Sequence, residues 1–254
     1  MDNKKNSGGN GKPLIKKLVG LVLHAIAPHT CAHCSVDLPF GKAALLCRDC
    51  QSRLEPIKQP FCQRCGTELP YGGAHCHFCA GSKADRFKCR VIRSAFSFNP
   101  ELQSAIHSFK YRYKPDMAKY LAPFLHMAFL RAPELAGPDR LVPVPVHKKR
   151  LAERGFNQSQ ALARELSALT GIPAEDVLEK IIHTRPQAGL SRKERLANLE
   201  NAFAVTGAVN GLDILLIDDV ATTGSTLEQC AAALKKAGAR KVRALTLARE
   251  MPPS

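Results

Sequence analysis

Residues 213–227, DILLIDDVATTGSTL, constrain the fold more than any other part of the sequence. An unbroken apolar run, residues 214–217, is typical of a strand covered on both faces in a parallel sheet. Asp218 and Asp219 end that run. After a loop of small residues, apolar side chains recur at helical spacing until Gly238 supplies a helix stop. The stretch therefore predicts an α/β fold in which an acidic pair and a small-residue turn connect a strand to a helix.

The loop between this strand and helix has the composition of a phosphate site. Free backbone amides at a helix start and neighbouring hydroxyls attract a phosphate, and a glycine removes the side chain that would keep it away. The order of the groups suits a phosphorylated sugar, because its ring hydroxyls can donate to the carboxylates while its phosphate lies on the amides. The predicted phosphate-binding residues are Thr222, Thr223, Gly224, Ser225 and Thr226.

Two other interpretations apply to the same stretch. Ser225 and Glu228 match a capping box, S-x-x-E, in which case the loop is only a helix start and the aspartates are only a polar strand end. A nucleotide hydrolase is the second interpretation, and it requires a GxxxxGK[ST] loop elsewhere in the chain. The sequence contains no such loop, which excludes that class.

The stretch resembles the phosphoribosyl-pyrophosphate motif of type I phosphoribosyltransferases. The resemblance implies that Asp218 and Asp219 hold the ribose 2′ and 3′ hydroxyls, and that residues 222–226 cradle the 5′-phosphate. It also implies that an active transferase of this kind would bind phosphoribosyl pyrophosphate together with Mg²⁺.

Eight of the ten cysteines form four CxxC pairs. Each CxxC turn brings two thiolates onto one face, and two such turns complete a tetrahedral site without an open position, which is typical of structural zinc. The pattern therefore predicts two zinc ions in a reducing compartment. Sequential pairing of the turns is the simplest arrangement, while interleaved pairing, a redox function and iron–sulfur binding stay open. The predicted ligands are Cys31, Cys34, Cys47, Cys50, Cys62, Cys65, Cys76 and Cys79.

The formal net charge of +15 favours a polyanionic partner such as nucleic acid, an anionic membrane or a phosphorylated ligand. No apolar run is long enough to span a bilayer. Residues 1–13 predict a disordered tail, and residues 14–28 predict a short amphipathic helix that packs on the neighbouring domain or contacts a membrane surface. Residues 18–27 also resemble a signal-peptide core, but reduced thiols and a phosphosugar site favour a cytoplasmic location.

The remainder of the chain reads as one α/β domain. The run HSFKYRYK, residues 107–114, interleaves aromatic and cationic side chains. These either stack on bases and neutralise phosphates, or present one face to the core and the other to solvent. The expected strands are residues 91–98, 141–146, 214–217 and 241–248, and the expected helices are residues 100–109, residues 116–130 and a segment that ends at Gly171.

A basic segment follows the expected strand at residues 141–146. The end of a parallel strand is where such a sheet receives an anionic ligand, and in type I phosphoribosyltransferases the loop at this place holds the pyrophosphate. The alternative is a solvated basic turn before the next helix. The candidate pyrophosphate-binding residues are Lys148, Lys149, Arg150 and Arg154.

A second basic segment, residues 183–203, reads HTRPQAGLSRKERLANLENAF. It occupies the place of the flexible loop that closes over the substrate in type I phosphoribosyltransferases. The resemblance implies that Arg185, Gln187 and Arg192 reach the diphosphate. The alternative is a mobile, solvated loop.

Together these segments resemble the ComF family of competence and DNA-utilisation proteins. The resemblance extends from Cys31 to the last strand and rests on the cysteine pairs, VPVPVHKKRLAERGFNQS, TRPQAGLSRKERLANLENAF and LLIDDVATTGST. It implies a double zinc ribbon at residues 29–84 and, at residues 85–254, a type I phosphoribosyltransferase-like domain with a parallel sheet flanked by helices. It also implies a role in handling DNA, single-stranded in particular, inside the cell during uptake or use as a nutrient.

Three hypotheses on function are compatible with this resemblance. The first is a DNA-handling protein that binds phosphoribosyl pyrophosphate or a related nucleotide. The second is a phosphoribosyltransferase of nucleotide salvage, for which the sequence identifies neither an acceptor nor a general base. The third is a zinc-ribbon adaptor on a catalytically inactive domain that docks a competence translocase or helicase.

Overall fold

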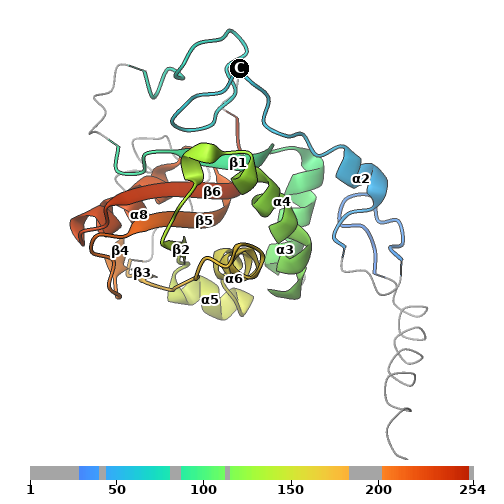
Figure 1. The fold of residues 1–254 in the computed structure, drawn as a ribbon. Helices are drawn as coiled ribbons and strands as arrows, with labels where there is room; N and C mark the ends of the chain where they lie inside the picture. Colours follow the sequence, from blue (N-terminus) through green and yellow to red (C-terminus); the bar gives the residue numbers. More distant parts are fainter. Residues whose placement is uncertain (1–28, 40–43, 81–86, 112–114, 183–201, 252–254) are drawn as a thin grey trace, which may run out of the picture.

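The computed structural model describes residues 29–39, 44–80, 87–111, 115–182 and 202–251 (Figure 1). The predicted tail at residues 1–13 and the predicted amphipathic helix at residues 14–28 lie outside the described residues. The same holds for three residues of the segment predicted to close over a substrate, Arg185, Gln187 and Arg192.

A parallel four-stranded sheet forms the centre of the α/β domain (Figure 1). Its strand order is β1-β6-β5-β2, so β6 and β5 are the central strands. This arrangement confirms the predicted parallel sheet. The strands are β1 (Ile92–Ser97), β2 (Arg140–Pro143), β5 (Asp213–Ala221) and β6 (Lys241–Arg249), and a separate antiparallel pair consists of β3 (Leu178–Lys180) and β4 (Phe203–Val205).

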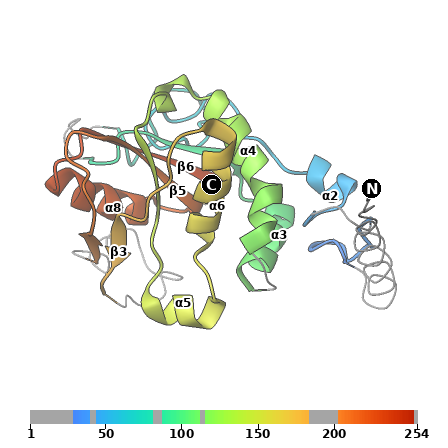
Figure 2. The same cartoon turned by 60° about the horizontal axis from the view of Figure 1, so that its bottom comes forward.

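The apolar run of the central strand β5 is buried on both faces because helices cover both (Figure 2). Leu215 and Ile217 of β5 pack in one core, and Ile214 and Leu216 pack in the other. Alternate side chains of a strand point to opposite faces, which explains why this run has no polar residue. One core contains α3 (Pro100–Tyr111), α4 (Ala118–Leu130) and α6 (Gln158–Thr170), the other contains α8 (Ser225–Lys236), and the 3-10 turns η2 (Pro115–Met117) and η3 (Pro133–Leu135) flank α4.

Two strands end at places that differ from the expected ones. The apolar run of β5 ends at Ile217, but its pairing with β6 continues to Ala221 opposite Arg249, so the main chain of the acidic pair belongs to the ladder. Strand β2 ends at Pro143 and not at Val146. Pro143 is followed by Val144 and a second proline, Pro145. Proline has no backbone N–H, so it cannot donate a hydrogen bond that would continue the ladder.

The basic segment after β2, expected to be a loop, is a short helix. Helix α5 (Lys148–Arg154) begins after His147, whose Nδ1 accepts a hydrogen bond from the backbone N of Lys149 at 3.2 Å. It ends at Gly155, which has a φ of +79°. Because side chains of a helix turn by about 100° per residue, the basic residues of α5 cannot all face one ligand.

The first cysteine-rich half of the N-terminal region contains Cys31, Cys34, Cys47 and Cys50. With helix α2 (Arg48–Ser52) it packs on the helical layer of α3 and α4 (Figure 1). Leu45, Leu46 and Leu54 are buried in the same core as those helices. Tyr120 of α4 donates its hydroxyl to Gln51 Oε1 at 3.1 Å. This half therefore completes the core of the α/β domain on that side.

The second cysteine-rich half contains Cys62, Cys65, Cys76 and Cys79. Two arginines connect it to α8 and β6 near the end of β5. Arg64 lies 2.8 Å from Glu228 in the first turn of α8, and both side chains are mostly buried. Arg64 also donates to Cys79 Sγ at 3.6 Å. Arg249, the last residue of β6, donates to Thr67 Oγ1 at 2.9 and 3.2 Å. The second half thus lies directly behind the predicted phosphate-binding loop.

We expect Glu228→Gln to destabilise the zinc-loaded protein by about 2–3 kcal/mol, because it leaves the mostly buried guanidinium of Arg64 without its carboxylate. Urea unfolding followed by circular dichroism measures the change. Glu179→Gln is the matched control, since it removes an ion pair with Lys148 that is largely exposed, and its effect should be much smaller. Equal effects of the two substitutions would show that the contact does not hold the second half in place.

Candidate functional site

The two aspartates predicted to bind a sugar lie near the carboxyl end of β5, where side chains of two helices hold them. Ser159 Oγ of α6 donates to Asp218 Oδ1 at 2.7 Å, and the same oxygen accepts the backbone N–H of Asp219 at 2.9 Å. Lys110 Nζ of α3 lies 2.6 Å from Asp219 Oδ2. Both carboxylates are therefore fixed in position by the protein itself.

The electrostatic environment shifts two titrating groups of this region. Burial and the neighbouring negative charge of Asp219 raise the pKa of the Asp218 carboxyl from its ordinary 3.8 to about 7. Burial and the positive charge of Arg150 lower the pKa of Lys180, a residue of β3. Hydrogen bonds donated to a carboxylate favour its charged form. A ligand with hydroxyl groups would therefore favour release of the Asp218 proton.

The predicted phosphate-binding loop makes a tight turn onto α8. Thr223 Oγ1 and Ser225 Oγ are hydrogen-bonded at 2.7 Å. The backbone N of Ser225 donates to Thr223 Oγ1 at 3.3 Å. The N-cap residue Gly224 has no side chain that could accept from the following amides, and free amides at a helix start favour anions. The φ of Gly224 is +76°, a left-handed backbone conformation that favours glycine, and a Cβ there would lie 3.1 Å from Ile92 Cδ1. The alternative capping box is not formed, because the Glu228 carboxylate binds Arg64.

A cavity of about 250 Å³ lies over the acidic pair. Its walls combine the two carboxylates with basic side chains that come from several separate elements. Positive charges in excess of the carboxylates attract a polyanion. The basic lining residues are Lys110, His147, Arg150, Arg154 and Lys180.

The structure brings part of the predicted site into this cavity. Lys148 does not line it and instead pairs with Glu179 at 2.8 Å, and Lys149 is exposed and is not a lining residue either. Residues 222–225 form the loop that leads into Thr226 at the cavity wall. The predicted residues that line the cavity are Arg150, Arg154, Asp218, Asp219 and Thr226.

Other lining residues are not predicted as part of a sugar–phosphate site. Lys110 belongs to the interleaved run at residues 107–114, which gave a signal for anion binding but not for this cavity. Within that run Phe109 is fully buried in the core, which excludes it from base stacking. Lys180 and Ser159 have no pattern that distinguishes them in the sequence. They reach the cavity only because β3 and α6 pack against the end of β5.

The eight predicted metal ligands form two groups, and their pairing is sequential. In each group the four sulfurs lie within 4.8 Å of one another. The sulfurs of Cys34 and Cys47 are 3.7 Å apart, and those of Cys65 and Cys76 are 3.6 Å apart. Four Zn–S bonds of about 2.3 Å in a tetrahedron separate the sulfurs by about 3.8 Å. Both groups therefore fit a zinc ion with four thiolate ligands, and interleaved pairing is wrong.

Two family models match the chain. A double zinc ribbon domain matches residues 22–80, which include both cysteine groups. A phosphoribosyl transferase domain matches residues 151–252, which include the acidic pair and the loop before α8.

The chain is also similar along most of its length to competence proteins and DNA utilization proteins. It is 33% identical to competence protein F of Haemophilus influenzae over 226 residues, 86% of this chain and 96% of the relative. It is 32% identical to DNA utilization protein YhgH of Escherichia coli K12, covering 88% and 98%. It is 32% identical to competence protein ComFC of Streptococcus pneumoniae, covering 80% and 87%. The chain belongs to the ComF family.

Membership of the ComF family confirms the resemblance seen in the sequence. This ComF-family chain combines a double zinc ribbon with a phosphoribosyltransferase-like α/β domain. Among the helices that the structure describes, none has the length and apolar character needed to cross a membrane.

The raised pKa of Asp218 predicts that the free energy of unfolding depends on pH. Its pKa in the folded protein, about 7, lies above the ordinary 3.8, so its stabilising contribution is complete below about pH 4 and is lost as the pH rises through 7. Asp218→Asn is neutral at every pH and keeps an oxygen that can accept from Ser159. We expect the advantage of Asp218→Asn over the natural protein to grow by about 2 kcal/mol between pH 5.5 and pH 8.5.

Urea unfolding of both zinc-loaded proteins at the two pH values measures this difference. An advantage that stayed constant, or that shrank toward pH 8.5, would contradict the raised pKa of Asp218 in the folded state.

Proposed function

We propose that this protein handles DNA during natural uptake or utilisation. We also propose that the cavity over Asp218 and Asp219, called the acidic cavity after this pair, binds phosphoribosyl pyrophosphate or a related nucleotide. The observation that carries the proposal is one cavity of about 250 Å³ in which Asp218 and Asp219 lie among several cationic side chains. A phosphorylated sugar presents the complementary groups, hydroxyls beside phosphates. The names of the three relatives, which refer to competence and DNA utilization, support the part of the proposal that concerns DNA.

The ribose of such a ligand would lie against the acidic pair. Its two hydroxyls would donate to the oxygens of Asp218 and Asp219, and Asp219 would then share its contact with Lys110. The 5′-phosphate would lie on residues 222–226 and the first amides of α8.

The diphosphate would lie among Arg150, Arg154 and Lys180. The guanidinium of Arg154 is already oriented, since it donates to Gln158 Oε1 at 3.1 Å and to the Tyr111 hydroxyl at 2.9 Å. A cation held in position loses less side-chain entropy when the ligand binds. Arg154 is therefore the residue of α5 best prepared to bind an anion.

Mg²⁺ would bind together with the diphosphate beside the acidic pair, because proteins hold this ion through one or two carboxylates together with phosphate oxygens of a substrate. There it would neutralise charge on the diphosphate. The two four-cysteine groups have a different function. Their four thiolates leave no open position on a zinc ion, so these sites stabilise the fold.

Single-stranded DNA is the proposed polyanionic partner, because the chain carries a formal net charge of +15. A competence translocase or helicase would be the partner that delivers the strand. The proposal places the protein in the cytoplasm, where cysteine thiolates stay reduced and available to zinc.

The sugar–phosphate site can be tested by calorimetric titration of phosphoribosyl pyrophosphate with Mg²⁺ into the zinc-loaded protein. We expect micromolar binding, and at least a tenfold loss of affinity in the double variant Asp218→Asn/Asp219→Asn, because the ribose hydroxyls lose their charged acceptors. A double variant of exposed carboxylates outside the cavity, Asp116→Asn/Asp176→Asn, also replaces two aspartates with asparagines and should bind normally. Equal affinity of the two double variants would refute the site.

The DNA part of the proposal predicts a strong salt dependence. Binding of a fluorescent oligothymidine should weaken more than tenfold between 50 and 200 mM NaCl, because contact with even about three phosphates releases their counterions. Fluorescence anisotropy measures the affinity at each salt concentration. Binding that is absent at 50 mM NaCl, or that does not change with salt, would rule out an electrostatic DNA-binding surface.

A further inference from the structure

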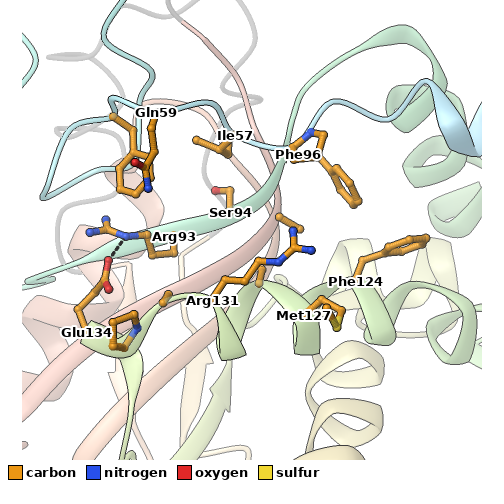
Figure 3. Close-up of a pocket in the computed structure, with 16 residues that line it drawn as sticks. Ile57, Gln59, Arg93, Ser94, Phe96, Phe124, Met127, Arg131 and Glu134 are labelled. Atoms are coloured by element: carbon orange, nitrogen blue, oxygen red, sulfur yellow. Dashed lines mark hydrogen bonds and ion pairs between the residues drawn. The ribbon is translucent and has the colours of Figure 1, made fainter. Parts of the chain in front are cut away.

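A second cavity, of about 570 Å³, lies beside the edge strand β1 and shares no lining residue with the acidic cavity (Figure 3). Its walls are the chain between the two cysteine groups, strand β1, and the end of α4 with the turn η3. This volume lies in the range of cavities that bind small molecules, roughly 300–1,000 Å³.

Main-chain hydrogen bonds close the edge of β1 at both ends of this cavity. The backbone N of Ile92 donates to Arg64 O at 2.7 Å, and that of Ser97 donates to Glu55 O at 2.8 Å. The chain between these two contacts, residues 56–63, forms the outer wall. An extended peptide therefore cannot add to β1 as a further strand. The cavity suits a compact ligand instead.

Aromatic rings supply much of the wall. The rings of Phe96 and Phe124 meet edge to face, with centroids 5.3 Å apart and an interplanar angle of 71°. The ring of Phe61 lies on another side, below the guanidinium of Arg93 at 5.0 Å. Flat aromatic rings stack well on phenylalanine faces and edges, whatever their substituents. The wall thus favours a ligand with a planar ring.

The cavity wall carries two arginines, Arg93 and Arg131, that differ in their partners. The charge of Arg93 is compensated by Glu134, and Arg93 also donates to Gln63 O at 2.8 Å. Arg131 reaches from the end of α4 toward β1 across the cavity (Figure 3). Within the part of the chain that the structure describes, no carboxylate lies in ion-pair contact with Arg131. The cavity therefore favours an anion.

Gln59 lies at the rim and contributes an amide, which can both donate and accept a hydrogen bond (Figure 3). The phenylalanine rings, this amide and Arg131 match the three parts of a nucleotide: the base face, the base edge and the phosphate. We propose that this cavity binds a nucleoside phosphate, either as a free nucleotide or as one residue of a single strand. The site is separate from the acidic cavity and does not depend on what that cavity binds.

The absence of tryptophan from the sequence allows a direct test. Phe124→Trp places the only indole of the full-length, zinc-loaded protein in the cavity wall, and a base that stacks on it should quench its fluorescence. Titration with deoxythymidine monophosphate should give saturable quenching. Tyr71→Trp is the matched control, because Tyr71 is fully exposed and lies outside the cavity, and it should show none. All titrations use an Arg150→Gln/Arg154→Gln background, which removes two of the cations that would hold a phosphate in the acidic cavity.

A second comparison does not depend on the tryptophan variant. By calorimetry in the same background, Arg131→Gln should bind deoxythymidine monophosphate about tenfold more weakly, the loss of one charge-assisted phosphate contact. Arg164→Gln removes an exposed cation of α6 that does not line the cavity, and it should bind unchanged.

Titration with a twelve-residue oligothymidine distinguishes the two sources of the ligand. Tighter, salt-sensitive binding of the oligomer that still depends on Arg131 identifies a residue of a strand. Equal binding of monomer and oligomer identifies a free nucleotide. The proposal is overturned if neither ligand binds, if the two tryptophan variants respond alike, or if Arg131→Gln behaves like Arg164→Gln.

Discussion

Strand β5 has to meet two opposing requirements, and the site depends on how it does so. Most of its length is buried between two helical layers, which allows only apolar side chains. Yet two carboxylates follow directly in the same strand. The ladder with β6 continues past them to Ala221, so their main chain keeps its hydrogen bonds while Ser159 and Lys110 hold the side chains. Two carboxyl groups can therefore lie at the edge of the core without disturbing it.

The positive and negative charges around the end of β5 do not cancel. Asp218 tends to keep a proton, while basic side chains from α3, α5 and β3 line the same cavity. Without a ligand the site holds more positive charge than its carboxylates neutralise. A bound polyanion would remove that repulsion, so part of the favourable free energy of binding is prepared in the empty site. This electrostatic attraction of a polyanion does not require any residue of the site to act as a general base.

Features encoded by neighbouring residues could be predicted from the sequence, while those assembled by packing could not. The apolar run, the acidic pair and the four CxxC turns are local patterns, and the structure places each as expected. Lys110, Lys180 and Ser159 come from three elements that only the folded chain brings together. Glu228 matched a capping box in the sequence, but its partner is an arginine 164 residues away. Lys148 and Lys149 were expected to bind a ligand because their segment was interpreted as a loop, although its residues are good helix formers and Gly155 follows them. Helix α5 leaves both lysines outside the cavity that Arg150 and Arg154 line.

The contacts of the zinc ribbons bear on how this family can diversify. Leu45 and Leu46 belong to the core of the α/β domain, and Arg64 reaches the helix that follows the phosphate-binding loop. Recombination that exchanged the ribbons of two relatives would break both interfaces at once unless the partner residues were exchanged with them. The ribbons and the α/β domain are therefore expected to be inherited as one unit. Their surfaces, unlike their shared interior, remain free to change between species.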